Sequence, residues 1–298
     1  MPQESTYAPT VRRPEDFEDF WRDAMSELAG LPAAPEIEAI PLRGTDFAAM
    51  YGVRLTSIGP YRIFCYYSVP HGGGPFPAIV RCPEYASVGL VPPYEERRSF
   101  VCLSVCARGQ RLSDKPFAAA FPGLLTEGID DPASYVYRGI FADTCRAIDF
   151  LLDRPEVDSR RIAVVGSDAA IAAAALRHTV SVLMASAPNL YDIVARAACT
   201  DEYPLEEIND YVRTFPDRAQ QIAGTLAYFD PLFLAPMVTA ETLLNCQPDG
   251  GLFDRERGGP LERAFAGSTT VYQQTGYSLR DFQANEDWLH KRLLGDRR

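Results

Sequence analysis

The segment from Arg160 to His178 restricts the fold of this chain more than any other. It reads RRIAVVGSDAAIAAAALRH, a short apolar strand that passes directly into an alanine-rich helix. A strand that is apolar at consecutive positions is typical of a parallel sheet with helices on both faces. A strand, a sharp turn and a helix in direct succession is also the setting of a nucleophile elbow. The segment therefore predicts an α/β fold with a functional turn.

The rest of the chain shows the same alternation of apolar strands and amphipathic helices. The strand-like runs are residues 51–57, 61–69, 76–82, 99–107, 161–165, 181–186, 242–246 and 269–273, and the helical patterns are residues 14–29, 135–152, 169–177 and 281–294. We expect one domain over residues 1–298, with a mostly parallel central sheet and helices on both faces. The acidic and aromatic stretch 191–229 is predicted to be an insertion that forms a lid.

The charge balance restricts the partners of the chain. There are 29 basic and 40 acidic side chains, a net charge of −11, and only two of the basic residues are lysines. Binding to nucleic acid or to anionic membranes depends on clustered Lys and Arg, so neither is expected. No apolar run is long enough to span a bilayer, and the first residues lack the apolar stretch of a secretory signal. We expect a cytoplasmic protein.

Cysteine and histidine usage argues against disulfides and metals. The seven cysteines are an odd number, and most lie in apolar strand-like runs such as SFVCLSVCA, which favours buried free thiols. The chain has three histidines, no Cys-x-x-Cys and no His-x-x-x-His, so the spacing of zinc ligands is absent. We expect no metal site and no other cofactor.

The register of the turn decides which side chain stands at its tip. The residues two before and two after the tip of an elbow must be small. With Ser167 at the tip, the β-branched Val165 would occupy the crowded position, whereas Asp168 would be flanked by Gly166 and Ala170. The pattern therefore predicts Asp168 at the tip as a functional carboxylate. The alternatives are that Asp168 only caps the helix, or that Ser167 is a displaced nucleophile.

Four stretches of the chain together resemble the acetyl xylan esterase and cephalosporin-C deacetylase group of α/β hydrolases, carbohydrate esterase family 7. They are PEDFEDFW, the ARGQ at 107–110, the run YVYRGIFADTCRAIDFLLDRPEVDSRRIAVVG and TLAYFDPLFLAP at 225–236. The resemblance implies the α/β-hydrolase fold, a Ser-Asp-His triad, an oxyanion hole and small acetyl esters as substrates. It also implies assembly into a homo-oligomer.

Both reactive members of the triad depart from the family pattern. The G-G-S-Q-G-G of the family aligns with residues 166–171, which places Asp168 at the serine position. The V-Y-P-Y-N-G-H-E of the family aligns with residues 271–278, which places Tyr277 at the histidine position. Tyr277 is interpreted either as a hydrogen-bond donor or acid, or as an aromatic ring that fills space. For the triad acid, Asp249 is the first candidate and Asp254 the second.

The resemblance implies further residues around the pocket. The H-G-Y of the family aligns with Pro83-Glu84-Tyr85, so that only Tyr85 is retained as an oxyanion donor, with the N–H of Ala169 as the second. Glu84 and Gln110 are pocket candidates by position. Arg108 belongs to a motif that is mainly structural in the family, and we favour that interpretation here.

The leading hypothesis on function follows from the absence of the family's serine and histidine at these two positions. A carboxylate in a dry pocket is suited to removing a proton from carbon. We therefore expect elimination of acetate from an acetylated small molecule, with Asp168 as base and Tyr277 and the backbone donors steadying the acetate. Proteins that resemble α/β hydrolases catalyse similar steps in polyketide pathways that form tetronates. The link to this chain is an analogy at the level of the fold. One alternative is an esterase that uses Asp168 without a triad, and the other is a non-catalytic relative.

Overall fold

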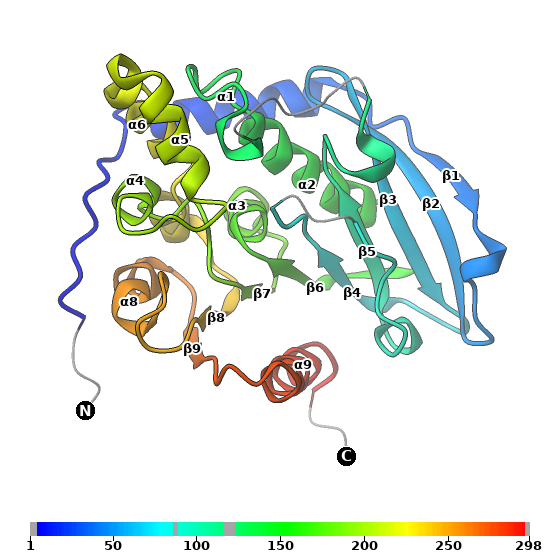
Figure 1. The fold of residues 1–298 in the computed structure, drawn as a ribbon. Helices are drawn as coiled ribbons and strands as arrows, with labels where there is room; N and C mark the ends of the chain where they lie inside the picture. The colour runs from blue at the N-terminus through cyan, green and yellow to red at the C-terminus, as the bar shows by residue number, and fades with distance from the viewer. Residues whose placement is uncertain (1–4, 86–88, 116–122, 296–298) are drawn as a thin grey trace.

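The computed structural model describes residues 5–85, 89–115 and 123–295, and a twisted nine-stranded sheet runs through the molecule (Figure 1). The order is β1-β2-β3-β5-β4-β6-β7-β8-β9. The pairs β1-β2, β2-β3 and β3-β5 are antiparallel, and the strands from β5 through β4 to β9 are parallel. The bounds are β1 Glu36–Ala39, β2 Ala48–Ser57, β3 Tyr61–Pro70, β4 Phe76–Arg81, β5 Val101–Cys106, β6 Val157–Gly166, β7 Val182–Ala185, β8 Glu241–Cys246 and β9 Thr269–Gln273.

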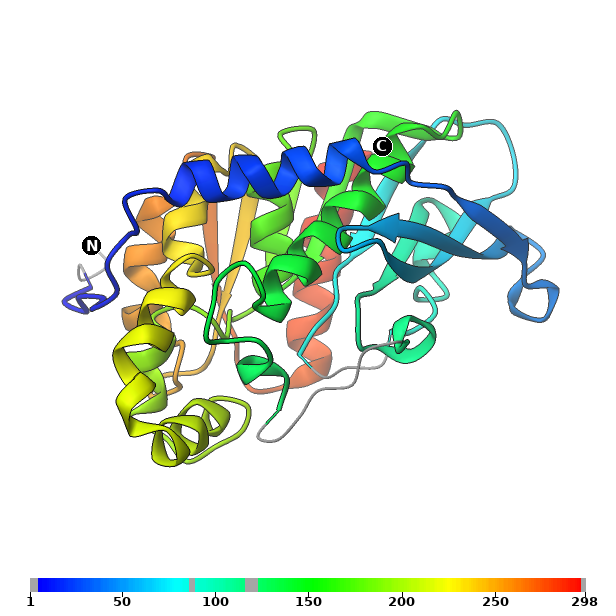
Figure 2. The ribbon, with the colours of Figure 1, turned by 90° about the horizontal axis from the view of Figure 1, so that it is seen from above.

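Helices cover both faces of the sheet. The helices are α1 Phe17–Gly30, α2 Val136–Leu152, α3 Asp168–Leu176, α4 Ile193–Ala197, α5 Glu206–Thr214, α6 Ala219–Ala227, α7 Pro231–Leu234, α8 Arg255–Ala264 and α9 Ser278–Leu294. α1, α2 and α3 lie on one face and α9 on the other (Figures 1 and 2). The expected α/β-hydrolase fold is confirmed.

Because helices cover both faces of the sheet, the central strands carry apolar residues at consecutive positions, as in residues 162–165 of β6. In β6, Ile162 and Val164 pack in the cluster that holds α1 to α3, whereas Ala163 and Val165 pack in the cluster that holds Leu289 and Leu293 of α9. Successive side chains of a strand point to opposite faces. A strand that lies between two helical layers therefore needs apolar residues on both of its faces.

The structure adds elements that the sequence patterns do not predict. β1 has the sequence EIEA and is exposed throughout, so it lacks the alternation of a half-buried strand. α8 contains Gly258, Gly259 and Pro260, residues that disfavour a helix. The stretch 191–229 lies between β7 and β8 and forms α4, α5 and α6, which gather at one end of the molecule (Figure 2). Its function as a lid stays a prediction.

The cysteines are free thiols, and all except Cys199 are buried. Within the described residues, no helix is both long and apolar enough to span a bilayer. The same part of the chain holds no group of histidine, cysteine and carboxylate side chains arranged to bind a metal ion.

Candidate active site

The order of the strands in the sheet brings together two loops, which follow the carboxyl ends of β4 and β6. The two strands are parallel neighbours, paired up to Arg81 and Val165, and the N–H of Cys82 donates to the carbonyl of Val165 at 2.8 Å. Glu84 and Ser167 follow these strand ends. The hydroxyl of Ser167 donates a hydrogen bond of 2.8 Å to Oε2 of Glu84. A serine and a carboxylate that lie 83 residues apart in sequence thus meet where α/β folds commonly place their active sites.

Ser167, and not Asp168, occupies the bend between β6 and α3. β6 ends at Gly166 with φ of 150°, Ser167 follows with φ of −102° and ψ of −121°, and α3 begins at Asp168. A Cβ on Gly166 would lie 3.0 Å from the Cβ of Cys82, so the small residue is required there. The expected register is therefore wrong by one residue. Val165 causes no clash because its side chain packs on the α9 face.

The carboxylate of Asp168 binds backbone groups of the loop that follows β7. Its Oδ2 accepts the N–H of Asn189 and its Oδ1 accepts the N–H of Leu190, each at 2.9 Å. Burial raises the pKa of Asp168 to about 6, and the two hydrogen bonds act against this rise. Both oxygens are thus occupied by donors of the protein. The arrangement ties the start of α3 to a neighbouring loop and is that of a structural carboxylate.

Gln110 holds the backbone of Glu84 in the position from which the Glu84 side chain reaches Ser167. The side-chain amide of Gln110 donates to the carbonyl of Glu84 at 2.9 Å, and its Oε1 accepts the N–H of Ala107 at 3.2 Å. Glu84 as a whole is exposed, but its carboxylate lies in the crowded space beside Gly166 and Ser167. Burial of the carboxylate and, to a lesser extent, the nearby Asp168 raise its pKa, while the hydrogen bond from Ser167 lowers it.

The residues around this pair enclose a small cavity. Its lining consists of Pro83, Glu84, Tyr85, Ala107, Arg108, Gln110, Leu124, Tyr137, Ile140, Ser167, Asp168 and Ala169. The free space is about 10 Å³, close to what a single water molecule needs. An acetyl group can enter only after some of the lining moves. With Ser167 at the bend, the next backbone N–H belongs to Asp168, not to Ala169, and it opens a helix whose first N–H groups have no intrahelical partner.

Arg108 borders the cavity, but its guanidinium is occupied by the buried Asp143. The backbone N and Nε of Arg108 each donate to Oδ2 of Asp143 at 3.0 Å, and Nη2 donates to Oδ1 at 2.8 Å. Nη2 also donates to the carbonyl of Ile58 at 3.1 Å. The guanidinium fits against Gly139, where any Cβ would collide with it. These contacts agree with the structural interpretation of Arg108.

Removing Arg108 should destabilise the fold strongly. In the Arg108→Ala variant, Asp143 would remain as a buried charge without its partner, and we expect a loss of about 3–5 kcal/mol in the free energy of unfolding. Urea unfolding followed by circular dichroism measures this. The matched control is Arg160→Ala, since Arg160 pairs with Asp158 while 89% of its side chain is exposed, and it should cost less than about 0.5 kcal/mol. A similar loss in both variants would contradict the structural assignment.

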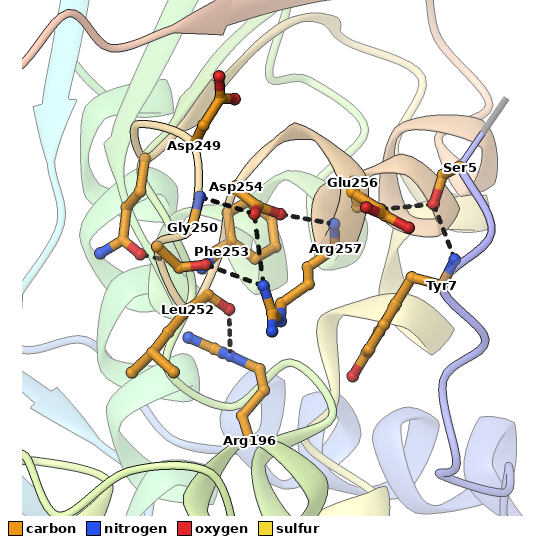
Figure 3. Close-up of polar contacts among 12 residues, drawn as sticks. Ser5, Tyr7, Arg196, Asp249, Gly250, Leu252, Phe253, Asp254, Glu256 and Arg257 are labelled. Carbon is orange, nitrogen blue, oxygen red and sulfur yellow. Dashed lines mark hydrogen bonds and ion pairs between the residues drawn. The ribbon is translucent and has the colours of Figure 1, made fainter. Parts of the chain in front are cut away.

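The other three sequence candidates lie outside this cavity. Tyr277 precedes α9, is 74% exposed and lines a separate surface depression with Leu279 and Arg280. Asp254 caps α8, accepting the N–H of Arg257 at 3.0 Å and that of Gly250 at 3.1 Å. Asp249 is exposed and accepts from Nε2 of Gln273 at 3.1 Å. Figure 3 shows Asp254 inside its network of contacts and Asp249 pointing away from it.

The structure does not place an imidazole at the bend. His71 contacts the carbonyl of Asp46, His178 is exposed, and His290 lies 3.4 Å from Glu286 on α9. None of the three lines the cavity around Ser167 in the described part of the chain. Any proton transfer from Ser167 would therefore go to Glu84, the acceptor that its hydroxyl contacts.

Stability should fall as the pH rises from about 4 to about 7. Burial raises the pKa of Asp168 to about 6 and that of Asp230 to about 7. Between the ordinary value for Asp and these raised values, the folded state holds protons that the unfolded state has lost, so each group lowers stability by up to about 1.4 kcal/mol per pH unit. Unfolding by urea at each pH measures the slope.

Asp230→Asn should flatten this slope, because the variant has one buried titratable group fewer. An exposed position, Asp153→Asn, serves as the matched control and should leave the slope unchanged. Stability that rises over the same pH range would contradict the assignment of these two buried acids.

Comparisons with known proteins agree with the fold. The family model for acetyl xylan esterases matches residues 1–254, which includes Glu84 and Ser167 and ends before β9 and Tyr277. An acetyl esterase, Axe7A of Xylanibacter ruminicola, is 25% identical over 253 residues, which cover 78% of this chain and 55% of that protein. The chain therefore spans about half the length of this curated relative.

Two solved structures are similar over nearly the whole chain. The acetyl xylan esterase from Paenibacillus sp. R4 superposes with a TM-score of 0.85 at 25% identity, covering 96% of this chain and 98% of that one. Acetyl xylan esterase 1 from Thermoanaerobacterium sp. JW/SL YS485 gives a TM-score of 0.82 at 22% identity, covering 94% and 96%.

Proposed function

Because the chain belongs to the acetyl xylan esterase family of α/β hydrolases, we propose that it hydrolyses O-acetyl esters of small molecules with Ser167 as nucleophile and Glu84 as general base. The observation that carries this proposal is the hydrogen bond of 2.8 Å from the Ser167 hydroxyl to the Glu84 carboxylate. A nucleophile within hydrogen-bond distance of its base is the arrangement that covalent catalysis requires.

The reaction follows two steps in which Glu84 moves the proton. Glu84 accepts the proton of Ser167 while Oγ attacks the acetyl carbonyl, and the backbone N–H groups of Tyr85 and Asp168 bind the negative oxygen. The protonated Glu84 then gives its proton to the departing alkoxide, which leaves as the alcohol. In the second step Glu84 removes a proton from water, and the resulting hydroxide attacks the acetyl-enzyme. The protonated Glu84 then returns its proton to Oγ of Ser167 as the bond to the acetyl group breaks, so that acetic acid leaves, to ionise in solvent, and both residues return to their starting states.

A carboxylate is a weaker base than imidazole, and the environment of Glu84 compensates in part. Burial raises the pKa of Glu84 above that of an exposed glutamate, which brings its basicity closer to the operating pH. Gln110 holds its backbone in place. The site therefore supports a serine hydrolase with a carboxylate base, a slower chemistry than that of a complete triad.

Elimination of acetate has less support than hydrolysis. It would need a free carboxylate beside a carbon of the substrate, and both oxygens of Asp168 accept backbone N–H groups. Tyr277, the expected partner of Asp168 in that reaction, lies in a separate surface depression. The same contacts leave Asp168 poorly suited to direct hydrolysis. A non-catalytic role remains the outcome if no acetyl ester is turned over.

Turnover in heavy-oxygen water tests this function. Small acetylated alcohols and sugars are incubated with the protein in H₂¹⁸O, and both products are analysed by mass spectrometry. Hydrolysis predicts acetate that carries the heavy isotope together with an unlabelled alcohol. Unlabelled acetate with an unsaturated product would indicate elimination and would overturn the proposal, as would the absence of any product.

A further inference from the structure

Tyr137 is a buried tyrosine that lines the Ser167 cavity. The residue lies in the first turn of α2, is only 4% exposed, and lines the cavity together with Glu84 and Ser167. Its hydroxyl makes no hydrogen bond to any residue that the structure describes. Tyr137 was not a candidate from the sequence, although it lies within the YVYRGIF run that resembles the family.

The neighbouring Tyr135 shows how a buried phenol is ordinarily satisfied in this fold. Tyr135 is 1% exposed, and its hydroxyl donates to the carbonyl of Leu125 at 2.9 Å. The two rings lie 5.4 Å apart in the same aromatic cluster. Buried phenols usually find a partner, because an unpaired buried hydroxyl costs free energy. The hydroxyl of Tyr137 has no such partner among the described residues, and it does not belong to their fully buried unpaired polar atoms. Its donor is therefore available to a molecule that enters the cavity.

The surroundings make Tyr137 a hydrogen-bond donor. Burial, followed by the nearby Tyr135, Asp168 and Glu84, raises the pKa of its phenol well above the ordinary value. The hydroxyl therefore keeps its proton throughout the working range of an esterase. The two carboxylates of the cavity, Glu84 and Asp168, offer only acceptors when ionised. An electron-rich oxygen of the substrate needs donors, and a neutral phenol supplies one without adding charge.

We propose that Tyr137 is a further catalytic residue, whose hydroxyl donates a hydrogen bond to the bridging oxygen of the acetyl ester. The inference rests on the proposed function. The carbonyl oxygen of the ester is already served by the backbone N–H groups that follow β4 and β6. The bridging oxygen gains negative charge as its bond to the acetyl carbon breaks, and no imidazolium is present to stabilise it. The phenol keeps its proton, and the proton that the leaving group acquires comes from Glu84.

Tyr137→Phe removes the hydroxyl and keeps the ring. Ethyl acetate has a poor leaving group and p-nitrophenyl acetate a good one, so stabilisation of the bridging oxygen matters more for the first. We expect kcat/KM to fall by about thirtyfold or more for ethyl acetate and by less than about threefold for p-nitrophenyl acetate. The melting temperature should stay the same, because the hydroxyl makes no hydrogen bond to a described residue that the variant would lose.

Tyr135→Phe is the matched control. It removes a phenol from the same aromatic cluster, but one that donates to Leu125. It should lower the melting temperature and change kcat/KM for both esters by less than about threefold. Unchanged kcat/KM for ethyl acetate in Tyr137→Phe would overturn the proposal. An equal loss for both esters would also overturn it, since that pattern indicates contact with the carbonyl oxygen.

The proposal and the function on which it rests fail in different ways. If the wild-type protein hydrolyses both esters and Ser167→Ala does not, a normal Tyr137→Phe variant refutes only the role of Tyr137. If the wild-type protein hydrolyses neither ester, the proposed function is refuted, and binding of ethyl acetate still tests Tyr137. Saturation-transfer NMR should then show weaker binding to Tyr137→Phe than to the wild type, and equal binding would refute the contact.

Discussion

Ser167→Ala should abolish the hydrolysis of acetyl esters, with a fall in kcat of about 10³-fold or more. The variant lacks the only hydroxyl that the structure places at the bend between β6 and α3, in hydrogen-bond contact with Glu84. Release of acetate from small acetyl esters, measured by a coupled assay, gives the rate. The fold should be retained, because alanine fits the bend and only one side-chain hydrogen bond is lost.

The control for Ser167 is Ser26→Ala, which removes an exposed hydroxyl that bonds within α1. Its activity should equal that of the wild type. Residual activity of Ser167→Ala above about a tenth of the wild-type rate would contradict a nucleophilic role for this residue, provided that circular dichroism shows an intact fold. Such a result would favour a carboxylate that acts directly on the ester or on water.

Glu84→Gln should lower kcat by about 10²-fold or more. Glutamine keeps the size of the side chain and can still accept a hydrogen bond from Ser167, but its amide cannot take up the proton. The wild-type kcat/KM should rise with pH as Glu84 ionises. Because burial raises the pKa of Glu84, this rise should lie above the pH at which an exposed glutamate titrates, about 4.3.

The residual activity of Glu84→Gln should not show this rise with pH. The matched control is Glu95→Gln, which changes an exposed glutamate that pairs with Arg98; it should leave both the rate and its pH dependence unchanged. If Glu84→Gln retains the wild-type rate and pH profile, another group accepts the proton of Ser167 and the proposed base is wrong.

The sequence predicts the parallel part of the fold well because its strands are covered on both sides. Consecutive apolar residues in β6 indicate a strand that is buried against two helical layers. The Ala-rich segment after it indicates a buried helix, as the structure shows for α3. β1 and α8 were missed for the opposite reason. β1 is exposed and charged, and α8 forms despite Gly258, Gly259 and Pro260 because tertiary packing overrides their low helix propensity.

The register of the bend could not be predicted from the residues around the turn. Val165 was expected to clash two residues before a tip at Ser167, yet its side chain packs on the α9 face. The face to which a strand residue points depends on the whole sheet, and the sequence around the turn does not contain that information. The expectation for Asp168 followed from this argument and from the alignment that places it at the serine position of the family. Its hydrogen bonds to the loop at Asn189 and Leu190 became visible only in three dimensions.

The partners of Ser167 could be found only in part. Glu84 and Gln110 were pocket candidates by their position in the stretches that resemble the family. The contact between Glu84 and Ser167, however, depends on β4 and β6 being neighbours. Tyr277 was a site candidate because it aligns with the histidine of the family. In the structure it is exposed and immediately precedes α9. The sequence therefore indicates which strand ends carry the site, while the topology decides which of them meet.

Trapping the acetyl-enzyme shows whether Ser167 is the nucleophile. The protein is mixed with p-nitrophenyl acetate, quenched in acid within the first turnover, digested and analysed by peptide mass spectrometry. The account predicts a peptide that carries one acetyl group on Ser167, and this signal should be absent in Ser167→Ala. Burst release of p-nitrophenol without acetylation of Ser167, or acetylation of another residue at the same rate, would contradict it.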